Sequence, residues 1–398
     1  MENLNVALIT PNYTGEEMSA TFNHSIDAGS TETRSSIFHL TDSSMVSEVL
    51  EVPADYAVYE SSLERIHSSS KNVADNLHFI ISDITDDKVE KYFDKTQIIK
   101  GSLLDKVICQ REVVTGVQSK IETTVTYTNI LCSLALRAYL TSCRKEQYIT
   151  EAICDLTVAL RPRDTETDAR CNYFFDRMAG TYEVELPRLN YKVTIVIPRD
   201  KILVDDEASL QLRYWAVTSG VNLNEVRNAV VLDCGGSSLD IGIFKNGVIY
   251  TEASDSYPYA GNNMEVLVSN RVQQEYGLSS LSKAERAEVL VNGYALNCKA
   301  YSATNAIKAA KVEMVKKILN VLNERLTVAE MQIKAVDYLL CSGRALNASG
   351  KEEFRVPSVV SMLNNQISKT SERTKVVKQN IDNPIVMGGI IYRLAQEK

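Results

Sequence analysis

The sequence predicts an α/β fold made of two similar halves. Its 398 residues are too many for one small hydrophobic core, so we expect two domains. Segments patterned as strands alternate with segments patterned as helices along most of the chain. Two strand–turn–strand segments with similar turn residues, within 23–40 and 228–245, lie far apart in the sequence. This repetition predicts that the two halves resemble each other.

The individual elements follow from apolar spacing and from Gly and Pro at the boundaries. Apolar residues three and four positions apart indicate helices, whereas short runs rich in β-branched residues indicate strands. We expect strands within 25–40, 152–160, 181–198, 228–253 and 336–342. We expect helices at 120–146, 206–220, 262–277, 282–299 and 305–326, and from Pro384 onward.

Composition argues against several classes of function. The formal net charge of -8 disfavours direct, extensive contact with nucleic acid, which needs basic patches to neutralise phosphates. The eight cysteines form no C-x-x-C pair and the four histidines lack ligand-like spacing, so neither a disulfide framework nor a zinc site is expected. The chain shows no signal-peptide pattern at its start and no apolar run as long as a membrane span. We therefore expect a cytoplasmic protein with reduced thiols and no membrane contact.

The turn in "VVLDCGGSSLDIGIF" (230–244) carries the residues of a phosphate-binding loop. A strand ends at Asp233, and the Gly-Gly-Ser-Ser turn offers backbone N–H groups without Cβ atoms, together with two hydroxyls. An aspartate beside such a loop can hold a hydrated Mg²⁺ ion against phosphate oxygens. The residues expected to bind the cofactor here are Gly235, Gly236, Ser237, Ser238 and Asp240. A simple glycine-rich β-turn is the alternative interpretation.

The turn in "IDAGSTETR" (26–34) repeats this order of strand end, aspartate, glycine, hydroxyls and next strand. Its expected phosphate-binding residues are Asp27, Gly29, Ser30 and Thr31. Neither turn matches a P-loop or a dinucleotide-binding glycine motif, because a strand follows each of them. One such turn is weak evidence, but two predict a clamp that holds one polyphosphate from two sides.

These motifs resemble those of the actin, Hsp70 and sugar-kinase superfamily of ATPases. "IDAGSTETR" is similar to its first phosphate motif, "LDCGGSSLDIG" to its second and "LLCSGRA" (339–345) to its adenosine motif, with Ser342 where a glycine is usual. The motifs follow the family's order and span residues 25 to 395. Their detailed form is most similar to bacterial plasmid-segregation actins of the ParM (StbA) type.

The resemblance implies an actin-like, ribonuclease H-like fold of two domains around a nucleotide cleft, each with a smaller subdomain. The implied boundaries are an N-terminal extension at 1–22, domain I at 23–228 with a subdomain near 50–115, domain II at 229–382 with a subdomain near 262–320, and a C-terminal helix at 383–398 that returns to domain I.

The resemblance also implies roles for single residues. Glu207 matches the family's acid that orients the attacking water, although the adjacent Asp205 and Asp206 leave its register open by a residue or two. Asp233 is the second expected catalytic residue, and it holds Mg²⁺ through water together with Asp27. Arg34 stands where the family usually has lysine and is expected to reach the β-phosphate. The adenosine side is expected to use Ser342, Gly343 and Arg344.

The implied function is a nucleotidase that polymerises into filaments on binding Mg-ATP, or Mg-GTP, and disassembles after hydrolysis. Filaments of this family segregate plasmid DNA through a DNA-binding adaptor at their ends, so no direct DNA contact is expected. A sugar-type small-molecule kinase of the same superfamily is the alternative, although no sugar-binding constellation is evident. An activator ATPase of acyl-CoA dehydratases would need cysteines for an iron–sulfur cluster, and an Hsp70-like chaperone would need a further substrate domain.

Overall fold

The chain folds into two compact units. In the computed structural model, unit 1 comprises Met1–Leu210 with Ile385–Lys398, and unit 2 comprises Gln211–Pro384. The structure describes residues 17–29, 32–38, 49–59, 72–86, 91–106, 110–112, 118–145, 147–347, 357–379 and 383–397. The units meet in sequence inside a helix, at 210/211, whereas we expected a boundary at 228/229.

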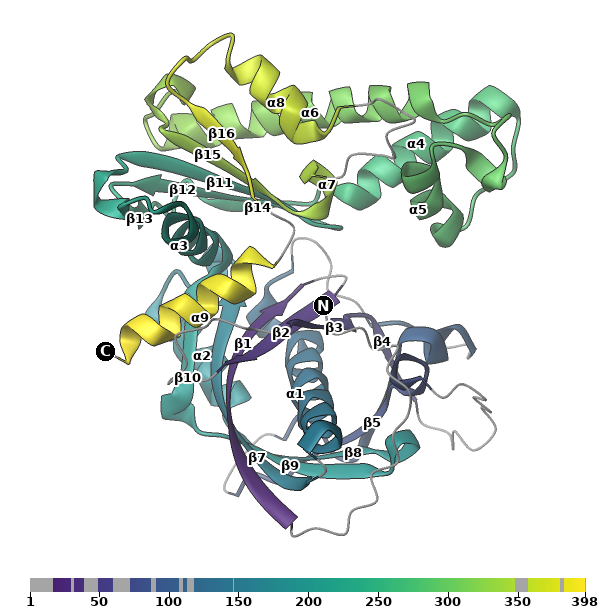
Figure 1. Ribbon diagram of the computed structural model, residues 1–398, viewed down its shortest axis with the longest axis vertical. Coiled ribbons are helices and arrows are strands. Elements are labelled where there is room, and N and C mark those ends of the chain that lie inside the picture. Colours follow the sequence, from purple (N-terminus) through teal and green to yellow (C-terminus); the bar gives the residue numbers. More distant parts are fainter. Residues whose placement is uncertain are drawn as a thin grey trace. The chain divides into compact units, whose positions relative to one another are not determined.

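Unit 1 is built on one large mixed sheet (Figure 1). In the described residues this sheet has ten strands in the order β3-β2-β1-β7-β9-β8-β5-β6-β4, with β10 paired to β7. Strand β1 is antiparallel to β2 and parallel to β7. The strands are β1 (Glu17–Ala28), β2 (Glu32–Phe38), β3 (Val49–Pro53), β4 (Tyr56–Val58), β5 (His78–Asp83), β6 (Thr96–Lys100), β7 (Tyr148–Leu160), β8 (Gly180–Leu186), β9 (Tyr191–Ile197) and β10 (Ile202–Asp206).

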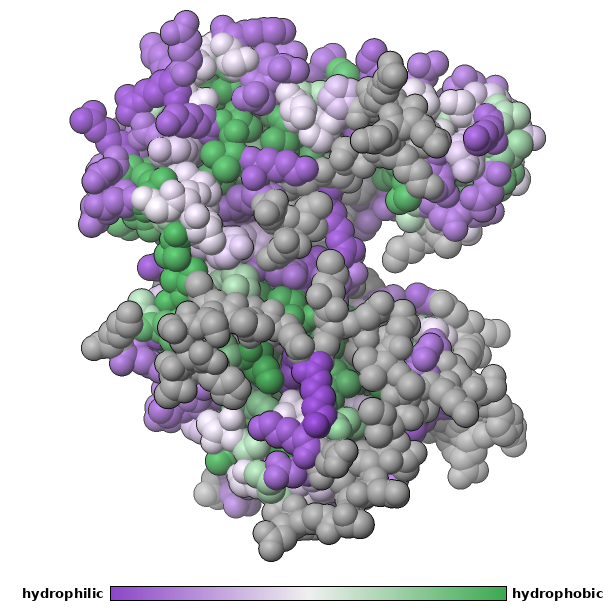
Figure 2. Space-filling view, viewed as in Figure 1, coloured by the Kyte–Doolittle hydropathy of each residue, from purple (hydrophilic) through white to green (hydrophobic). Residues whose placement is uncertain are grey.

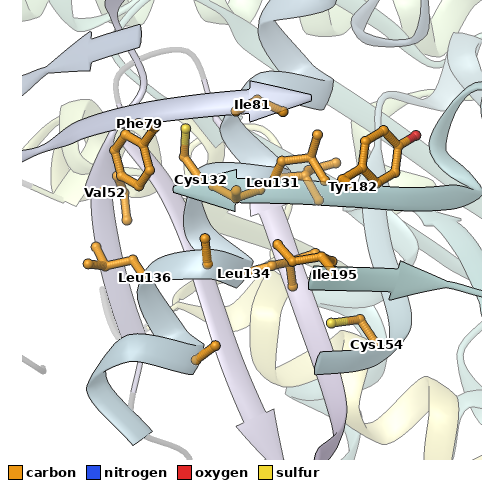
Figure 3. Close-up of a cluster of buried hydrophobic side chains, with 14 of the residues drawn as sticks. Val52, Phe79, Ile81, Leu131, Cys132, Leu134, Leu136, Cys154, Tyr182 and Ile195 are labelled. Atoms are coloured by element: carbon orange, nitrogen blue, oxygen red, sulfur yellow. The ribbon is translucent and has the colours of Figure 1, made fainter. Parts of the chain in front are cut away.

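Helix α1 (Thr124–Lys145) lies in the core of unit 1. Every residue from Val125 to Ser142 is buried, so the helix is enclosed on all sides rather than amphipathic. Figure 3 shows its apolar side chains among those of the surrounding strands, including Phe79 and Ile195. The predicted helix at 120–146 is confirmed, except that Lys120–Glu122 forms a separate 3-10 turn before it.

Unit 2 combines a smaller sheet with several helices. In its described residues the sheet has six strands in the order β13-β12-β11-β15-β16, with β14 paired to β12. The strands are β11 (Asn228–Cys234), β12 (Leu239–Lys245), β13 (Val248–Ile249), β14 (Asp255–Tyr257), β15 (Tyr338–Ser342) and β16 (Lys375–Lys378). The helices are α4 (Gly261–Tyr276), α5 (Lys283–Asn292), α6 (Thr304–Val328), α7 (Arg344–Asn347) and α8 (Val359–Ile367). On the face shown in Figure 2, hydrophilic residues predominate on this unit and apolar ones are interspersed.

Two helices occur where the chain passes from one unit to the other. Helix α3 (Glu207–Ser219) contains the first passage, and α9 (Pro384–Gln396) contains the second, directly after its first residue. A Cβ atom on Gly388 would lie 2.0 Å from the carbonyl oxygen of Leu210, so α9 packs on the backbone of α3 at a residue without a side chain. Buried Arg393 then ties α9 to unit 1 by donating to Thr157 Oγ1 and to the carbonyl of Leu156.

Several expected elements differ from the observed ones. Strand β1 begins at Glu17, inside the segment expected to be an extension at 1–22. The helix expected at 282–299 ends at Asn292, because Gly293 adopts φ +77° and caps it. Helix α2 (Asp168–Met178), which Thr167 caps by accepting a hydrogen bond from the backbone N–H of Arg170, was not predicted. Helix α8 and strand β16 were not predicted either.

Candidate functional site

The first hairpin brings Asp27 and Arg34 opposite each other. They are paired in the antiparallel register of β1 and β2, and Arg34 Nη1 lies 3.9 Å from Asp27 Oδ2. Arg34 also forms ion pairs at 3.2 Å with Glu32 and with Glu51 on β3. Gly29 follows β1, and Ser30 and Thr31 lie outside the described residues. The arginine is therefore held by three carboxylates beside the predicted phosphate turn.

Asp27, Lys120 and Glu207 meet in the interior of unit 1. Asp27 is next to last in β1, Lys120 begins the 3-10 turn before α1, and Glu207 begins α3. Lys120 Nζ forms a hydrogen-bonded ion pair with Glu207 Oε1 and lies 3.9 Å from Asp27 Oδ1. All three residues are at most 5% exposed. Three distant parts of the chain thus contribute to one buried cluster of charge.

The charges of this cluster support one another. Burial by itself lowers the pKa of a lysine, but the carboxylates of Glu207 and Asp27 more than offset this effect, and the pKa of Lys120 is raised above its ordinary value. Lys120 is therefore a cation at neutral pH. This buried cation lies between the two carboxylates, and Arg34, with Nη1 3.9 Å from Asp27 Oδ2, supplies a second positive charge beside them.

The three consecutive acids at the start of α3 have different surroundings. Asp206, the last residue of β10, caps the helix, because its Oδ1 accepts a hydrogen bond from the backbone N–H of Ser209 at 2.8 Å. Burial and then the charge of Asp205 raise the pKa of Asp206 to about 7, against the opposing effect of the bonds from Ser209. Glu207 is the acid that contacts Lys120. Glu207 thus belongs to the buried cluster with Asp27, whereas Asp206 bonds to its own helix; which of them orients a water stays a prediction.

The second hairpin places Asp233 opposite Asp240. The two residues are paired in the antiparallel register of β11 and β12, and the N–H of Gly235 donates to the carbonyl of Ser238 at 3.0 Å across the turn. Asp240 accepts hydrogen bonds from the hydroxyls of Ser238, at 2.8 Å, and of Ser256. Both of its carboxylate oxygens therefore contribute to the fold of the turn.

The start of α4 lies against this turn. The N–H groups of Gly261 and Asn262 donate to the carbonyls of Gly235 and Gly236, at 3.1 and 2.8 Å. Ser237, the remaining residue of the predicted loop, is half-buried. These bonds engage the carbonyls of the turn and fix its conformation, which is the preorganisation that an anion-binding loop needs.

The predicted adenosine motif lies directly beside the second hairpin. Strand β15 runs parallel to β11, with Ser342 paired to Asp233 at the carboxyl ends of the two strands. Gly343 has φ +85°, and a Cβ atom there would lie 2.2 Å from the carbonyl oxygen of Cys234. Arg344 is exposed at the start of α7. The structure thus joins the second and third predicted motifs at one edge of the sheet of unit 2.

Gln211 connects these two strand ends. Its Nε2 donates to Asp233 Oδ2 at 3.1 Å, and its Oε1 accepts from Ser342 Oγ at 2.5 Å. Ser342 is 2% exposed, and its hydroxyl makes this bond inside unit 2. Its expected place on the adenosine side stays a prediction.

Sequence reasoning missed Lys120 and Gln211. Neither residue belongs to a motif. Lys120 lies in an ordinary polar segment before helix α1, and Gln211 lies inside helix α3. Lys120 contacts Glu207, which is 87 positions away in the sequence. Gln211 contacts Ser342, which is 131 positions away. One local signal was available for Gln211. A glutamine within the apolar run of a buried helix needs a polar partner, but the sequence does not identify that partner.

The residues present are suited to magnesium held together with phosphates. Among the described residues, no three His, Cys, Asp or Glu side chains gather into a metal site. Mg²⁺ in nucleotide sites is usually bound by one or two carboxylates, water and phosphate oxygens, so it does not need such a cluster. Asp27 and Asp233 carry the hard oxygen ligands that this ion prefers, and both lie at strand ends beside the turns.

Comparison with known proteins places this geometry in a known fold. No family model and no curated protein matches the sequence. Solved structures do match: the archaeal actin homolog Ta0583 in complex with ADP is 13% identical, with a TM-score of 0.59 over 94% of this chain and 99% of that one. Bacillus thuringiensis ParM with ATP is 10% identical, with a TM-score of 0.61 over 95% and 99%.

The chain has an actin-like fold. The Alp12 filament structure, 16% identical, matches it as well, with a TM-score of 0.55 over 95% of this chain and 99% of that one. The expected two-domain, actin-like α/β fold is thereby confirmed across nearly the whole length. Among the described residues of this actin-like chain, no helix combines the length and the apolar character needed to cross a membrane.

Proposed function

We propose that this actin-like protein is a nucleoside triphosphatase that assembles into filaments when it binds Mg-ATP and disassembles after hydrolysis. The observation that carries the proposal is the buried cluster of Asp27, Lys120 and Glu207, which joins the first phosphate motif to the expected water-orienting acid. ATP is the favoured nucleotide because Ta0583 with ADP and ParM with ATP share the fold. GTP is the alternative nucleotide, and the experiment described below tests it beside ATP.

The proposed chemistry divides among the motifs. Backbone N–H groups of the two phosphate turns hold the phosphates of one nucleotide, and Arg34 adds a cation at the first turn. Asp27 and Asp233 would hold Mg²⁺ through water, and the bound ion would supply neutralising charge on the phosphate oxygens. Glu207 accepts a hydrogen bond from the water that attacks in line with the bond to be broken. In this proposal an arginine contacts the phosphates, and carboxylates serve the metal ion and the attacking water.

Filament formation and cargo belong to the same proposal. The Alp12 filament structure shares the fold, which supports self-association by repeated contacts between copies of this chain. We propose that the filaments segregate plasmid DNA through a basic DNA-binding adaptor at their ends, because a chain with net charge -8 is poorly suited to contact DNA directly. Cytoplasmic location follows from this role, and the cysteines are expected to stay reduced there.

The experiment follows phosphate release and light scattering of the purified protein with Mg-ATP, Mg-GTP, Mg-ADP and a non-hydrolysable ATP analogue. Electron microscopy of the same samples identifies filaments. We expect scattering to rise with the triphosphate, to fall as phosphate is released, and to persist with the analogue. Scattering that stays flat with every nucleotide contradicts filament formation. Phosphate transfer that requires an added sugar or other hydroxyl acceptor indicates a kinase instead.

A further inference from the structure

Lys120 contacts the acid on which the proposed hydrolysis depends. Its Nζ pairs with Glu207 Oε1, and the side chains of the two residues are only 4% and 7% exposed. We propose that Lys120 is a positioning residue, which fixes the carboxylate of Glu207 in the orientation that accepts a hydrogen bond from the attacking water. This inference rests on the proposed function, in which Glu207 orients that water.

The backbone of Lys120 is itself firmly held. Its N–H donates to Asp164 Oδ2 at 2.9 Å, and the hydroxyl of Ser119 donates to Asp164 Oδ1 at 2.6 Å. Arg170 donates to the same oxygen at 2.9 Å, and Asp164 is 1% exposed. A buried carboxylate with three donors therefore anchors the turn that carries Lys120. The lysine side chain extends from this anchored point to Glu207.

Glu207 needs such a partner to be well placed. A glutamate has three side-chain torsions, each with several staggered or broad minima, and as the first helical residue Glu207 is not confined by a preceding turn of α3. The ion pair with Lys120 selects one of these arrangements. Because misplacement of a reacting group by about 1 Å can lower a rate about 100-fold, this selection bears directly on hydrolysis.

Burial argues for this role over direct binding of a phosphate. A lysine that binds phosphate presents its ammonium toward the ligand, whereas the Lys120 side chain is almost entirely enclosed and already paired. Asp27, at 3.9 Å, is the second charge near Nζ, and it lies on the strand that leads into the first phosphate turn. Lys120 thus acts on the site through carboxylates of its own unit.

The test measures kcat and KM for Mg-ATP in Lys120→Met, Lys120→Arg, Glu207→Gln and the double variant Lys120→Met/Glu207→Gln. We expect Lys120→Met to lower kcat by about 10- to 100-fold with little change in KM, since it misplaces Glu207 without touching the nucleotide. Lys120→Arg should restore part of the loss. In the Glu207→Gln background, Lys120→Met should lower kcat no further, because the acid that it positions is gone.

A matched control is Lys100→Met, which removes another fully buried lysine of unit 1. Lys100 bonds to Asn129 Oδ1 and to the carbonyl of Pro53, away from the predicted motifs. Its replacement should lower stability yet leave kcat of the folded protein unchanged. If Lys120→Met proves too unstable to assay, Lys120→Arg is compared in the wild-type and Glu207→Gln backgrounds, and this cycle measures the coupling instead.

The outcomes separate this inference from the proposed function. Equal losses of kcat from Lys120→Met in the wild-type and Glu207→Gln backgrounds overturn it, because the lysine then acts independently of Glu207. A rise in KM alone overturns it as well and indicates direct phosphate binding. Wild-type turnover that Lys120→Met leaves unchanged contradicts the role of Lys120 while the proposed function stands. A wild-type protein without turnover contradicts the proposed function, and the role of Lys120 falls with it.

Discussion

Gln211 holds Asp233 by donating a hydrogen bond from its Nε2 to the carboxylate oxygen Oδ2 at 3.1 Å. The oxygen of the same amide accepts a bond from Ser342, and the backbone carbonyl of Gln211 accepts one from Gln379 at 3.2 Å. Gln211 is fully buried, and it is the residue of α3 at which unit 2 begins. One amide therefore ties the ends of β11 and β15 to the helix through which the chain enters unit 2.

The first prediction is that Gln211→Leu weakens the binding of Mg-ATP. The substitution removes both side-chain hydrogen bonds, each worth about 0.5–1.5 kcal/mol or more where one partner is charged, so Asp233 loses a fixed orientation. We expect Kd to rise by roughly 10-fold, and by more in Gln211→Glu, which places a second carboxylate beside Asp233. Titration of a fluorescent ATP analogue at fixed Mg²⁺ measures the change.

Gln366→Leu is the matched control, because Gln366 is exposed on α8 of the same unit. Its Kd should equal that of the wild type. Unchanged affinity in both Gln211 variants, with intact folding, would show that Asp233 is oriented without this amide.

The second prediction concerns Glu207 and Asp233, which have different expected roles. Glu207→Gln should slow hydrolysis strongly while leaving nucleotide binding nearly intact, because a neutral amide orients the attacking water less well. The filaments should then outlive those of the wild type. Asp233→Ala should abolish turnover by lowering the affinity for the Mg-nucleotide as well. Phosphate release and light scattering of the same samples check both. Faster disassembly in Glu207→Gln contradicts the assigned role.

The sequence predicted the elements and turns whose signals are local. Asp27 and Asp233 lie next to last in their strands and precede Gly- and Ser-rich turns, so their neighbours in sequence identify them. The buried strand around Leu339 and the enclosed helix α1 follow from apolar runs. In each case the residues that determine the structure lie within a few positions of one another.

The features that were missed depend on partners far away in the chain. Helix α2 buries only Phe174 and Met178, so its apolar pattern is too sparse to identify it. Lys120 and Gln211 gain their roles from residues that only the folded chain brings near. The passage between the two compact units lies within the regular pattern of α3, so no change of composition marks it in the sequence.

The third prediction is that Asp206 makes unit 1 less stable as the pH rises toward neutrality. Its pKa is about 7 in the folded protein, above the ordinary aspartate value of about 4 in an unfolded chain. At low pH both states hold the proton. Between these values the unfolded chain releases it while the folded protein keeps it, so the free energy of unfolding falls as the pH increases.

Asp206→Asn removes this titration and keeps a residue that caps helices well. The loss of stability between pH 5 and pH 8, measured by urea unfolding, should therefore be smaller in this variant than in the wild type. Asp200→Asn, at an exposed aspartate of the same unit, is the control and should leave the pH dependence unchanged. If the free energy of unfolding changes equally in the wild type and in Asp206→Asn over this range, the pKa of Asp206 is not raised.

The fourth prediction separates two truncations at the N-terminus. Strand β1 begins at Glu17, and its residues from Glu17 to Phe22 pair with β7 between Tyr148 and Cys154. Met18, Ala20 and Phe22 alternate here with polar residues, but the pattern is short and follows a polar segment, so the sequence suggested an extension. Removing residues 1–22 should therefore destabilise unit 1 relative to removing residues 1–16, because it deletes the paired backbone and buried Phe22.

The burial of one phenylalanine is worth about 1.5–3 kcal/mol, so the difference in the free energy of unfolding should be at least of this size. Urea unfolding of both truncated proteins and the full chain measures it. Phe22→Ala in the protein that lacks residues 1–16 isolates the side-chain part, and the remainder then reports the pairing with β7. Two truncated proteins of equal stability would show that β1 contributes to unit 1 only from Asn23 onward, as the sequence had suggested.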